Sequence, residues 1–340
     1  MFKQFGAALL ASGIAFSAQA SDFYIDRGVD WLNPGDDANS TTGTVTELGY
    51  SGTLATSIYF PTGPSIAGAT VVDTNIQPIL AGLFSDGAPA NGNYVTLDGD
   101  TLTTNGHAKF DSTPSFGQIN IESLNPLSTG VDDTEGYGAG VAFGFQFFYQ
   151  YLLTGSVNAA GTEINFTGGF FNLFMVDNDA FGTPQVGGAR QVLQVQVTGS
   201  QTTPANLFIL GQVDYGWCEP ACSNETKNLF VDSNTNQSFY NIWKSATPPP
   251  VISFVLDTNV NPPIPTADQL VGIGPAFAAQ TGLAANCSAV DPSNPLLANS
   301  SCMVRQTTLD GSATFNVPEP GSLALVGLGL LGLGLRRRKA

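Results

Sequence analysis

Two aromatic runs occupy the middle of the chain: VAFGFQFFYQYLL at residues 141–153 and EINFTGGFFNLFMV at residues 163–176. The short segment between them, Asn-Ala-Ala-Gly at 158–161, contains residues that favour turns. The two runs therefore predict a long β-hairpin. The pair Gly168-Gly169 interrupts the second run and indicates a bulge.

The first run also predicts which side chains share a face. Phe143, Phe145 and Phe147 alternate with smaller or polar residues, so a strand places the three rings on one side. We expect these rings to fill the space between two sheets. The alternative is an exposed platform on which sugars stack.

Further strands are predicted on both sides of this hairpin, because shorter runs show the same alternation or lie between turn residues. They cover residues 53–60, 94–97, 100–104, 116–121, 191–197, 207–213, 251–256, 304–308 and 312–317. One segment of the body, 266–280, has a short helical pattern. The pattern predicts an all-β fold, a large β-sandwich or jelly-roll-like body of two sheets.

Composition supports a β protein and restricts its partners. The chain has 39 glycines, 21 prolines and 23 phenylalanines, and its 27 acidic residues outnumber 11 basic ones, giving a net charge of −16. Five of the basic residues lie in the two terminal segments, so the body is more acidic still. Such a charge repels nucleic acid, which we exclude as a partner.

The N-terminus has the three parts of a secretory signal peptide. Lys3 supplies a positive charge, residues 5–16 are mostly apolar, and Ala18-Gln19-Ala20 forms an A-x-A site before Ser21. We predict a signal peptide over residues 1–20, cleaved between Ala20 and Ser21.

The C-terminus also has three parts in a fixed order. Val317, Pro318, Glu319 and Pro320 precede an uncharged apolar tract at 321–335. A basic cluster follows, made of Arg336, Arg337, Arg338 and Lys339. As a helix the tract is about 22 Å long, short for a hydrocarbon core of ~30 Å. We predict a transmembrane helix over 321–335 that serves as a temporary anchor, with the basic cluster on the cytoplasmic side.

This C-terminal arrangement resembles the PEP-CTERM sorting signal of exported proteins of Gram-negative bacteria, a motif that is also labelled an ice-binding protein C-terminal domain. The resemblance implies that an exosortase-type enzyme recognises residues 317–320 and processes the chain at the inner membrane. It also implies a final location at the cell surface or in the extracellular matrix. Residues 168–173 and 310–316 weakly resemble flocculation-associated PEP-CTERM proteins, which implies adhesion in biofilms or flocs.

The four cysteines indicate disulfides, because an exported chain meets an oxidising environment. Four cysteines allow three connectivities. We favour two local pairs, Cys218 with Cys222 and Cys287 with Cys302, since each closes a short polar loop. The second loop would contribute about 3 kcal/mol by restricting the unfolded chain.

Nothing in the sequence identifies a catalytic centre. His107 is the single histidine and no G-x-S-x-G motif is present, which argues against a serine triad and a histidine metal centre. The segment Asp232–Asn236 begins like an EF-hand loop but has Gln237 and Trp243 where glycine and glutamate are needed. We assign no catalytic, cofactor-binding or metal-binding residue and expect no cofactor. The alternative is a structural Ca²⁺ ion bound at acidic loops, at residues 98–100, 132–133 or 177–179.

The domain organisation follows from these segments: a signal peptide at 1–20, an extracytoplasmic β-rich domain at 21–316 and a sorting signal at 317–340. The expected function is that of a non-enzymatic structural protein of the cell surface or matrix. Its partners would be the sorting enzyme, transiently the inner membrane, and extracellular polysaccharide. The alternatives are a carbohydrate-binding module, with Tyr24, Trp31, Trp217 and Trp243 as its platform, and a secreted hydrolase with two carboxylates about 5 to 9.5 Å apart.

Overall fold

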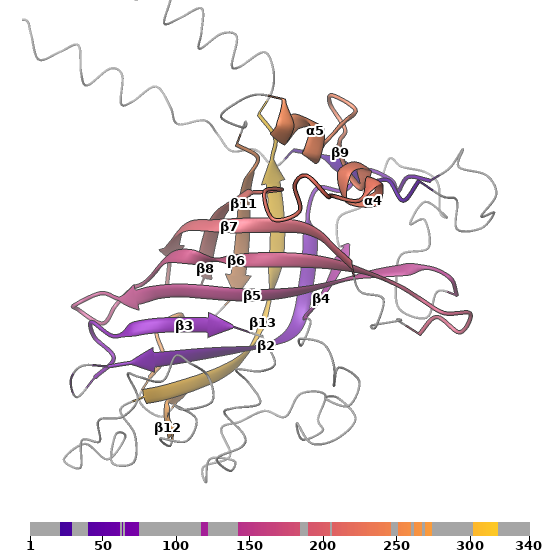
Figure 1. Cartoon of the computed structure of the whole chain (residues 1–340). Coiled ribbons are helices and arrows are strands. Elements are labelled where there is room, and N and C mark those ends of the chain that lie inside the picture. The colour runs from indigo at the N-terminus through magenta and orange to yellow at the C-terminus, as the bar shows by residue number, and fades with distance from the viewer. Residues whose placement is uncertain are drawn as a thin grey trace, which may run out of the picture.

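The computed structural model describes residues 21–28, 40–61, 63, 65–74, 117–121, 142–183, 190–204, 206–245, 251–259, 262–266, 269–273 and 302–318. In this part of the chain the secondary structure is mostly β (Figure 1). The strands are β1 (Phe23–Ile25), β2 (Leu48–Phe60), β3 (Thr70–Thr74), β4 (Gly117–Ile121), β5 (Phe145–Val157), β6 (Ile164–Asp177), β7 (Arg190–Thr202), β8 (Asn206–Val213), β9 (Phe230–Asp232), β10 (Gln237–Ser238), β11 (Ser253–Asn259), β12 (Val271–Ile273) and β13 (Cys302–Asn316). The helices are α4 (Asn224–Asn228) and α5 (Phe239–Lys244).

Within the described ranges, the main sheet has ten antiparallel strands and closes on itself. Its order is β12-β13-β11-β8-β7-β6-β5-β3-β2-β4, and β13 pairs with β2 as well as with β11. Strands β3 and β4 both bridge β2 and β5, at opposite ends of those long strands. Figure 1 shows β5, β6 and β7 running across β11 and β13 at a steep angle. The all-β prediction is confirmed, and the two layers are parts of one continuous sheet.

The predicted central hairpin is present. Strands β5 and β6 pair over their whole length, from Phe145 opposite Asp177 to Val157 opposite Ile164. The register shifts between Thr154 and Gly155, so the predicted bulge lies beside the glycine pair. At this bulge Gly169 has φ 119°, a conformation that L side chains rarely adopt.

Aromatic rings fill the interior of the closed sheet, as expected. Tyr149 stacks on Phe171 at 5.0 Å, Phe171 contacts Phe254 at 5.5 Å, and Phe254 contacts Phe315 at 5.6 Å between ring centroids. These rings come from β5, β6, β11 and β13, so contacts between them join opposite sides of the sheet. The prediction that Phe143 shares the inner face with Phe145 and Phe147 is wrong, because Phe143 precedes β5, has φ 57° and is 64% exposed.

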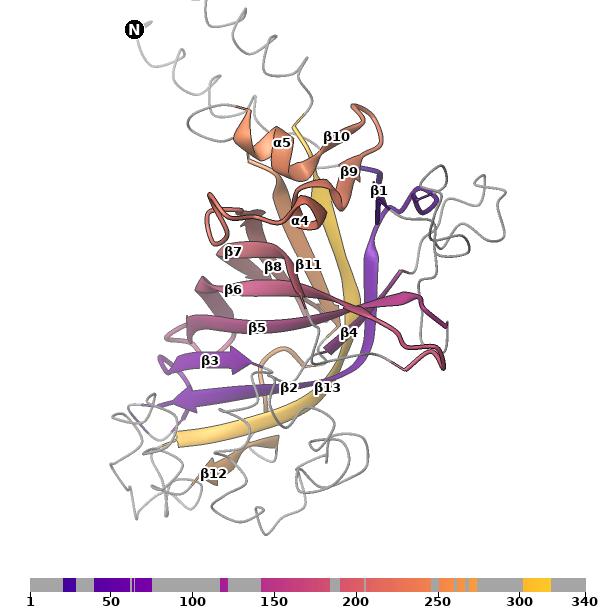
Figure 2. The same ribbon diagram turned by 45° about the vertical axis from the view of Figure 1, so that its right-hand side comes forward.

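A small sheet and two short helices cover one end of the main sheet (Figure 2). The small sheet has the order β1-β9-β10. Its Phe230 packs against Phe315 and Phe147 of the main sheet, at 6.3 and 5.7 Å between ring centroids. Arg190 joins the two parts through ion pairs to Asp177 on β6, at 2.8 Å, and to Glu225 on α4, at 2.6 Å.

Several predicted elements differ from the structure. The helix predicted at 266–280 is wrong where that segment is described, because Val271–Ile273 forms β12 and pairs with β13. The strands predicted at 304–308 and 312–317 are one strand, β13, with a register shift between Leu309 and Gly311. The strands predicted at 94–97 and 100–104 lie outside the described residues.

The two short helices were missed because they are too brief to show a period. Each has a serine N-cap: Ser223 accepts a hydrogen bond from the Thr226 N–H, and Ser238 accepts one from the Asn241 N–H. Neither of the helices in the described ranges is long and apolar enough to span a membrane. The transmembrane helix predicted at 321–335 lies outside those ranges.

Candidate functional site

The sorting junction is the point where β13 ends and the predicted sorting motif begins. Val317 follows β13 directly and is 5% exposed. Its backbone N–H donates to the Ser21 hydroxyl at 2.9 Å, and the Ser21 N–H donates to the Phe315 carbonyl at 2.8 Å. The predicted mature N-terminus therefore lies against the start of the sorting motif. Pro318 is half-buried beside it.

The remaining predicted signal residues lie outside the described part of the chain. They are Ala20, Glu319, Pro320, Arg336, Arg337, Arg338 and Lys339. The signal peptide and the basic cluster consequently stay predictions from sequence.

The local disulfide favoured for the first cysteine pair is present. Cys218 and Cys222 are joined, with their Cα atoms 4.8 Å apart. The bridge closes the turn before α4. In this turn Glu219 accepts a hydrogen bond from the Tyr240 hydroxyl and forms an ion pair with Lys244 at 3.1 Å. Cys302 is the first residue of β13, and its predicted partner Cys287 lies outside the described residues.

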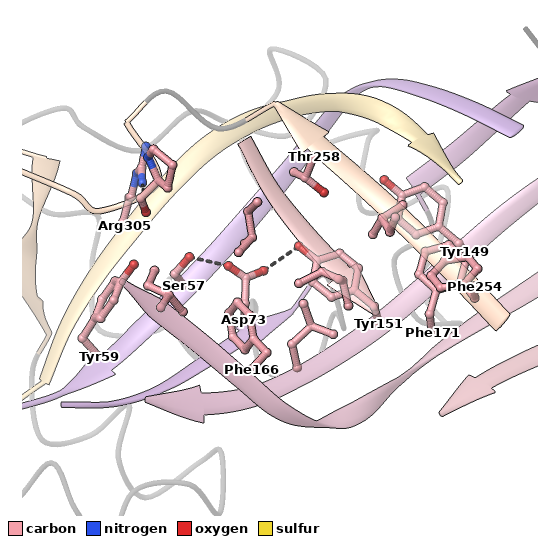
Figure 3. A pocket seen from close by; sticks show the side chains of 16 residues that line it. Ser57, Tyr59, Asp73, Tyr149, Tyr151, Phe166, Phe171, Phe254, Thr258 and Arg305 are labelled. Atoms are coloured by element: carbon pink, nitrogen blue, oxygen red, sulfur yellow. Dashed lines mark hydrogen bonds between the residues drawn. The ribbon is translucent and has the colours of Figure 1, made fainter. Parts of the chain in front are cut away.

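A cavity with a mostly apolar lining and one row of polar side chains lies inside the closed sheet, and no sequence pattern predicted it. Ser57 on β2 is the register partner of both Asp73 on β3 and Arg305 on β13. This cross-strand row brings the three polar side chains to one inner face, where all three are buried. They line a cavity of about 40 Å³, together with Tyr59, Tyr151 and a wall of apolar and aromatic side chains (Figure 3).

Asp73 is the only carboxylate among the described residues that line this inner cavity. Its two oxygens accept hydrogen bonds from the Ser57 hydroxyl and from the Tyr151 hydroxyl, the latter at 2.7 Å. Burial raises the pKa of Asp73, while these hydrogen bonds and the charge of Arg305 oppose the rise. The carboxyl group of Asp73 therefore changes its protonation state at a lower pH than the phenol of Tyr59, the other group of the inner cavity with a raised pKa.

Tyr59 has an unmet hydrogen-bonding group in the same cavity. Its side chain is fully buried and, within the described structure, its hydroxyl makes no hydrogen bond of good geometry, although Ser57 and Arg305 are close. Figure 3 shows this hydroxyl directed toward Ser57 and Arg305. Burial and the nearby Asp73 raise the pKa of Tyr59, so the group is a neutral phenol. A buried hydroxyl without a partner costs about 1–3 kcal/mol.

Arg305 connects the inner cavity to a groove on the surface. Its Nη1 donates to the carbonyls of Pro262 at 2.8 Å and Pro263 at 3.3 Å. Pro263 lines both hollows, so this segment is the wall between them. The outer groove measures about 370 Å³, and its lining consists of Thr162, Glu163, Thr202, Thr203, Pro204, Pro262, Pro263 and Ile264.

The sequence does carry one signal for the inner cavity. Asp73 and Arg305 are single charged residues of opposite sign within runs of strand-forming residues. A charge in such a run is rarely buried without a partner. The sequence alone does not show that β3 and β13 both flank β2, so the two charges could not be paired in advance.

The other candidate residues from the sequence have structural roles or lie elsewhere. Asp179 accepts hydrogen bonds from the N–H groups of Phe181 and Thr183, and Asp232 accepts them from Thr235. Tyr24, Trp217 and Trp243 are half-buried, so they form no open aromatic platform. No cluster of potential metal ligands occurs among the described residues. Trp31, His107 and the acidic loops at 98–100 and 132–133 lie outside them.

Comparison with known proteins identifies the C-terminal segment. The fold and the sorting junction define an all-β protein whose last long strand leads into a sorting segment. A family profile, the PEP-CTERM protein-sorting motif, matches residues 316–339 of this chain. The motif indicates exosortase-dependent export and sorting to the cell surface. No curated protein and no solved structure matches the chain.

Proposed function

We propose that this protein is a non-enzymatic structural protein of the cell surface or extracellular matrix, and that it acts in adhesion within biofilms or flocs. The observation that carries the proposal is the position of the sorting motif. Residues 316–339 match the motif, and the match begins at Asn316, the last residue of β13. The sorting segment thus leaves from a strand paired on both sides within the closed sheet.

The distribution of carboxylates favours a structural role over a hydrolase. A glycoside hydrolase needs two carboxyl groups facing one cleft, about 5 to 9.5 Å apart. Among the lining residues that the structure describes, the inner cavity has the single carboxylate Asp73 and the outer groove has the single carboxylate Glu163. The wall formed by Pro262 and Pro263 lies between the two hollows.

The charge of the chain also suits an extracellular scaffold. A net charge of −16 keeps the protein soluble and repels anionic surfaces. Adhesion would then depend on neutral partners, and we name extracellular polysaccharide as the partner class. The sorting enzyme and, transiently, the inner membrane are the partners on the route to the surface.

Deleting the gene and scoring aggregation of the source cells tests the adhesive function. We expect weaker aggregation after deletion, recovery with the full chain, and no recovery with a chain lacking residues 317–340. Normal aggregation of the deletion strain would contradict the adhesive function.

A second measurement tests the sorting route. The double substitution Pro318→Ala with Pro320→Ala should leave the protein in the cell envelope, and Pro204→Ala is the control because it lies in the β7–β8 turn. If the double variant reaches the surface like the control, residues 317–320 are not the sorting determinant.

A further inference from the structure

The geometry points to a binding site for a small uncharged molecule rich in hydroxyl groups, such as a polyol or a single sugar unit. The ligand would lie in the outer groove and place one hydroxyl in the inner cavity, at Tyr59, Asp73 and Arg305. This site goes beyond the adhesive function and does not depend on it, because purified protein can bind such a ligand without cells aggregating.

The volumes of the outer groove and the inner cavity fit a ligand that lies in the groove and places one hydroxyl in the cavity. The outer groove of about 370 Å³ is within the range of small-molecule pockets, roughly 300–1,000 Å³. The inner cavity of about 40 Å³ exceeds the 10–15 Å³ that one water requires. It accepts a hydroxyl group and its carbon, while a complete sugar ring would have to stay in the groove.

The unmet hydroxyl of Tyr59 is the observation that points to a ligand. This phenol is fully buried, lines the inner cavity and makes no hydrogen bond of good geometry in the described structure, although Ser57 and Arg305 lie close to it. Buried polar groups in native proteins nearly always have a partner from protein, water or ligand. A ligand hydroxyl between Tyr59 and Arg305 would supply the missing bond.

The chemistry of the inner cavity selects an uncharged hydroxyl. Asp73 accepts hydrogen bonds, Arg305 donates them, and the phenol of Tyr59 does both. A carboxylate on the ligand would face Asp73, and an amine would face Arg305. A hydroxyl both donates and accepts, so it satisfies both sides without bringing a charge into a buried site.

The segment formed by Pro262 and Pro263, which separates the inner cavity from the outer groove, can be displaced by a ligand. Pro262 and Pro263 have no N–H, so neither residue can donate a backbone hydrogen bond to the sheet. Their carbonyls are held by the guanidinium of Arg305, at 2.8 and 3.3 Å. A ligand hydroxyl that accepts from Arg305 replaces these bonds, which opens the inner cavity to the groove.

The lining of the outer groove is largely apolar, from three prolines and Ile264, and the polar atoms that it offers to such a ligand are oxygens. The hydroxyls of Thr202 and Thr203 already donate to backbone carbonyls, so they can act toward a ligand only as acceptors. Glu163 contributes an exposed carboxylate that can also accept from ligand hydroxyls. The acidic net charge of the chain disfavours anionic ligands at the same position.

Calorimetric titration of the full-length protein tests the proposal, with glycerol, glucose and galactose as neutral probes and glucuronate and glucosamine as charged ones. We expect a neutral probe to bind and Tyr59→Phe to weaken it at least about tenfold. Tyr24→Phe is the matched control, because that hydroxyl lies on the small sheet and bonds weakly to Asn236 at 3.4 Å. Thermal unfolding of Tyr59→Phe should be unchanged or shifted upward, since the substitution removes an unsatisfied group.

Glu163→Gln provides a second variant that leaves the core intact, and it should weaken the same probe severalfold. The proposal is overturned if no neutral probe binds, which would mean that the inner cavity holds water only. It is also overturned if a charged probe binds more tightly than its neutral counterpart, or if both variants bind like the wild type.

Discussion

The backbone N–H of Val317 donates a hydrogen bond to the Ser21 hydroxyl at 2.9 Å, although 296 positions separate the two residues. The Ser21 N–H donates in turn to the carbonyl of Phe315, near the C-terminal end of β13. The predicted mature N-terminus and the start of the sorting motif are therefore held at one end of the closed sheet. This contact holds Val317, the first residue of the predicted sorting motif, against the folded body.

The Ser21 hydroxyl should stabilise this junction measurably. Ser21→Ala removes the acceptor for the Val317 N–H, which belongs to a residue only 5% exposed. We expect the free energy of unfolding to fall by about 1–2 kcal/mol in chemical denaturation, since a buried donor loses its partner. Ser156→Ala on the exposed side of β5 is the control and should change stability by less than about 0.5 kcal/mol. Equal stability of the two variants would show that water replaces the serine without loss.

The bulge of the central hairpin depends on Gly155. A Cβ at this position would overlap the backbone carbonyl of Asn165 and the Cα of Phe166. We expect Gly155→Ala to lower the free energy of unfolding by about 3 kcal/mol, because the clash is with backbone and the strands must separate. Gly199→Ala on β7 is the control, since nothing lies within 4 Å of its added Cβ. A Gly155→Ala protein as stable as the control would contradict the observed register of β5 and β6.

Burial of Asp73 should make stability depend on pH. Its pKa is raised in the folded protein, so between the ordinary aspartate pKa and the raised value the folded state binds more protons than the unfolded state. The free energy of unfolding should therefore decrease as pH rises through this window and level off above the raised pKa. The groups that face the carboxyl are Ser57, Tyr151, Tyr59 and Arg305.

Denaturant unfolding across this window checks the Asp73 prediction, with Asp73→Asn as the comparison. The asparagine variant should lose this part of the slope and keep the contributions of other groups, such as Asp257, whose pKa is also raised by burial. Parallel pH profiles for the two proteins would mean that the carboxyl of Asp73 does not titrate in the folded state above its ordinary pKa.

The disulfide between Cys218 and Cys222 should contribute modestly. It closes a short loop, with a sequence separation of 4, so restriction of the unfolded chain stabilises the fold by about 2 kcal/mol. The double substitution Cys218→Ala with Cys222→Ala should lower the midpoint of thermal unfolding accordingly. Loss of all structure in the double variant would contradict this modest contribution, because the disulfide would then be needed for the whole fold.

Local patterns predicted much of the fold. The alternation in residues 141–153 and 163–176 identified β5 and β6, because a strand has a two-residue period that is visible in a short window. Where the period was weak, prediction failed: α4 and α5 are too short to show one, and Val271–Ile273 is a strand because it pairs with β13. Phe143 has the alternation of its neighbours, but the chain turns before β5 begins.

The residues themselves, read in order, determine the all-β class, the central hairpin and the sorting segment, because each of these depends on composition or on neighbours close in the chain. Closure of the sheet is different in kind, since β2 and β13 come from opposite ends of the body and their pairing joins residues that are far apart in the chain. That pairing puts Asp73 and Arg305 on either side of Ser57 and creates the buried cavity. A long-range register decides which side chains meet, and no local pattern contains that register.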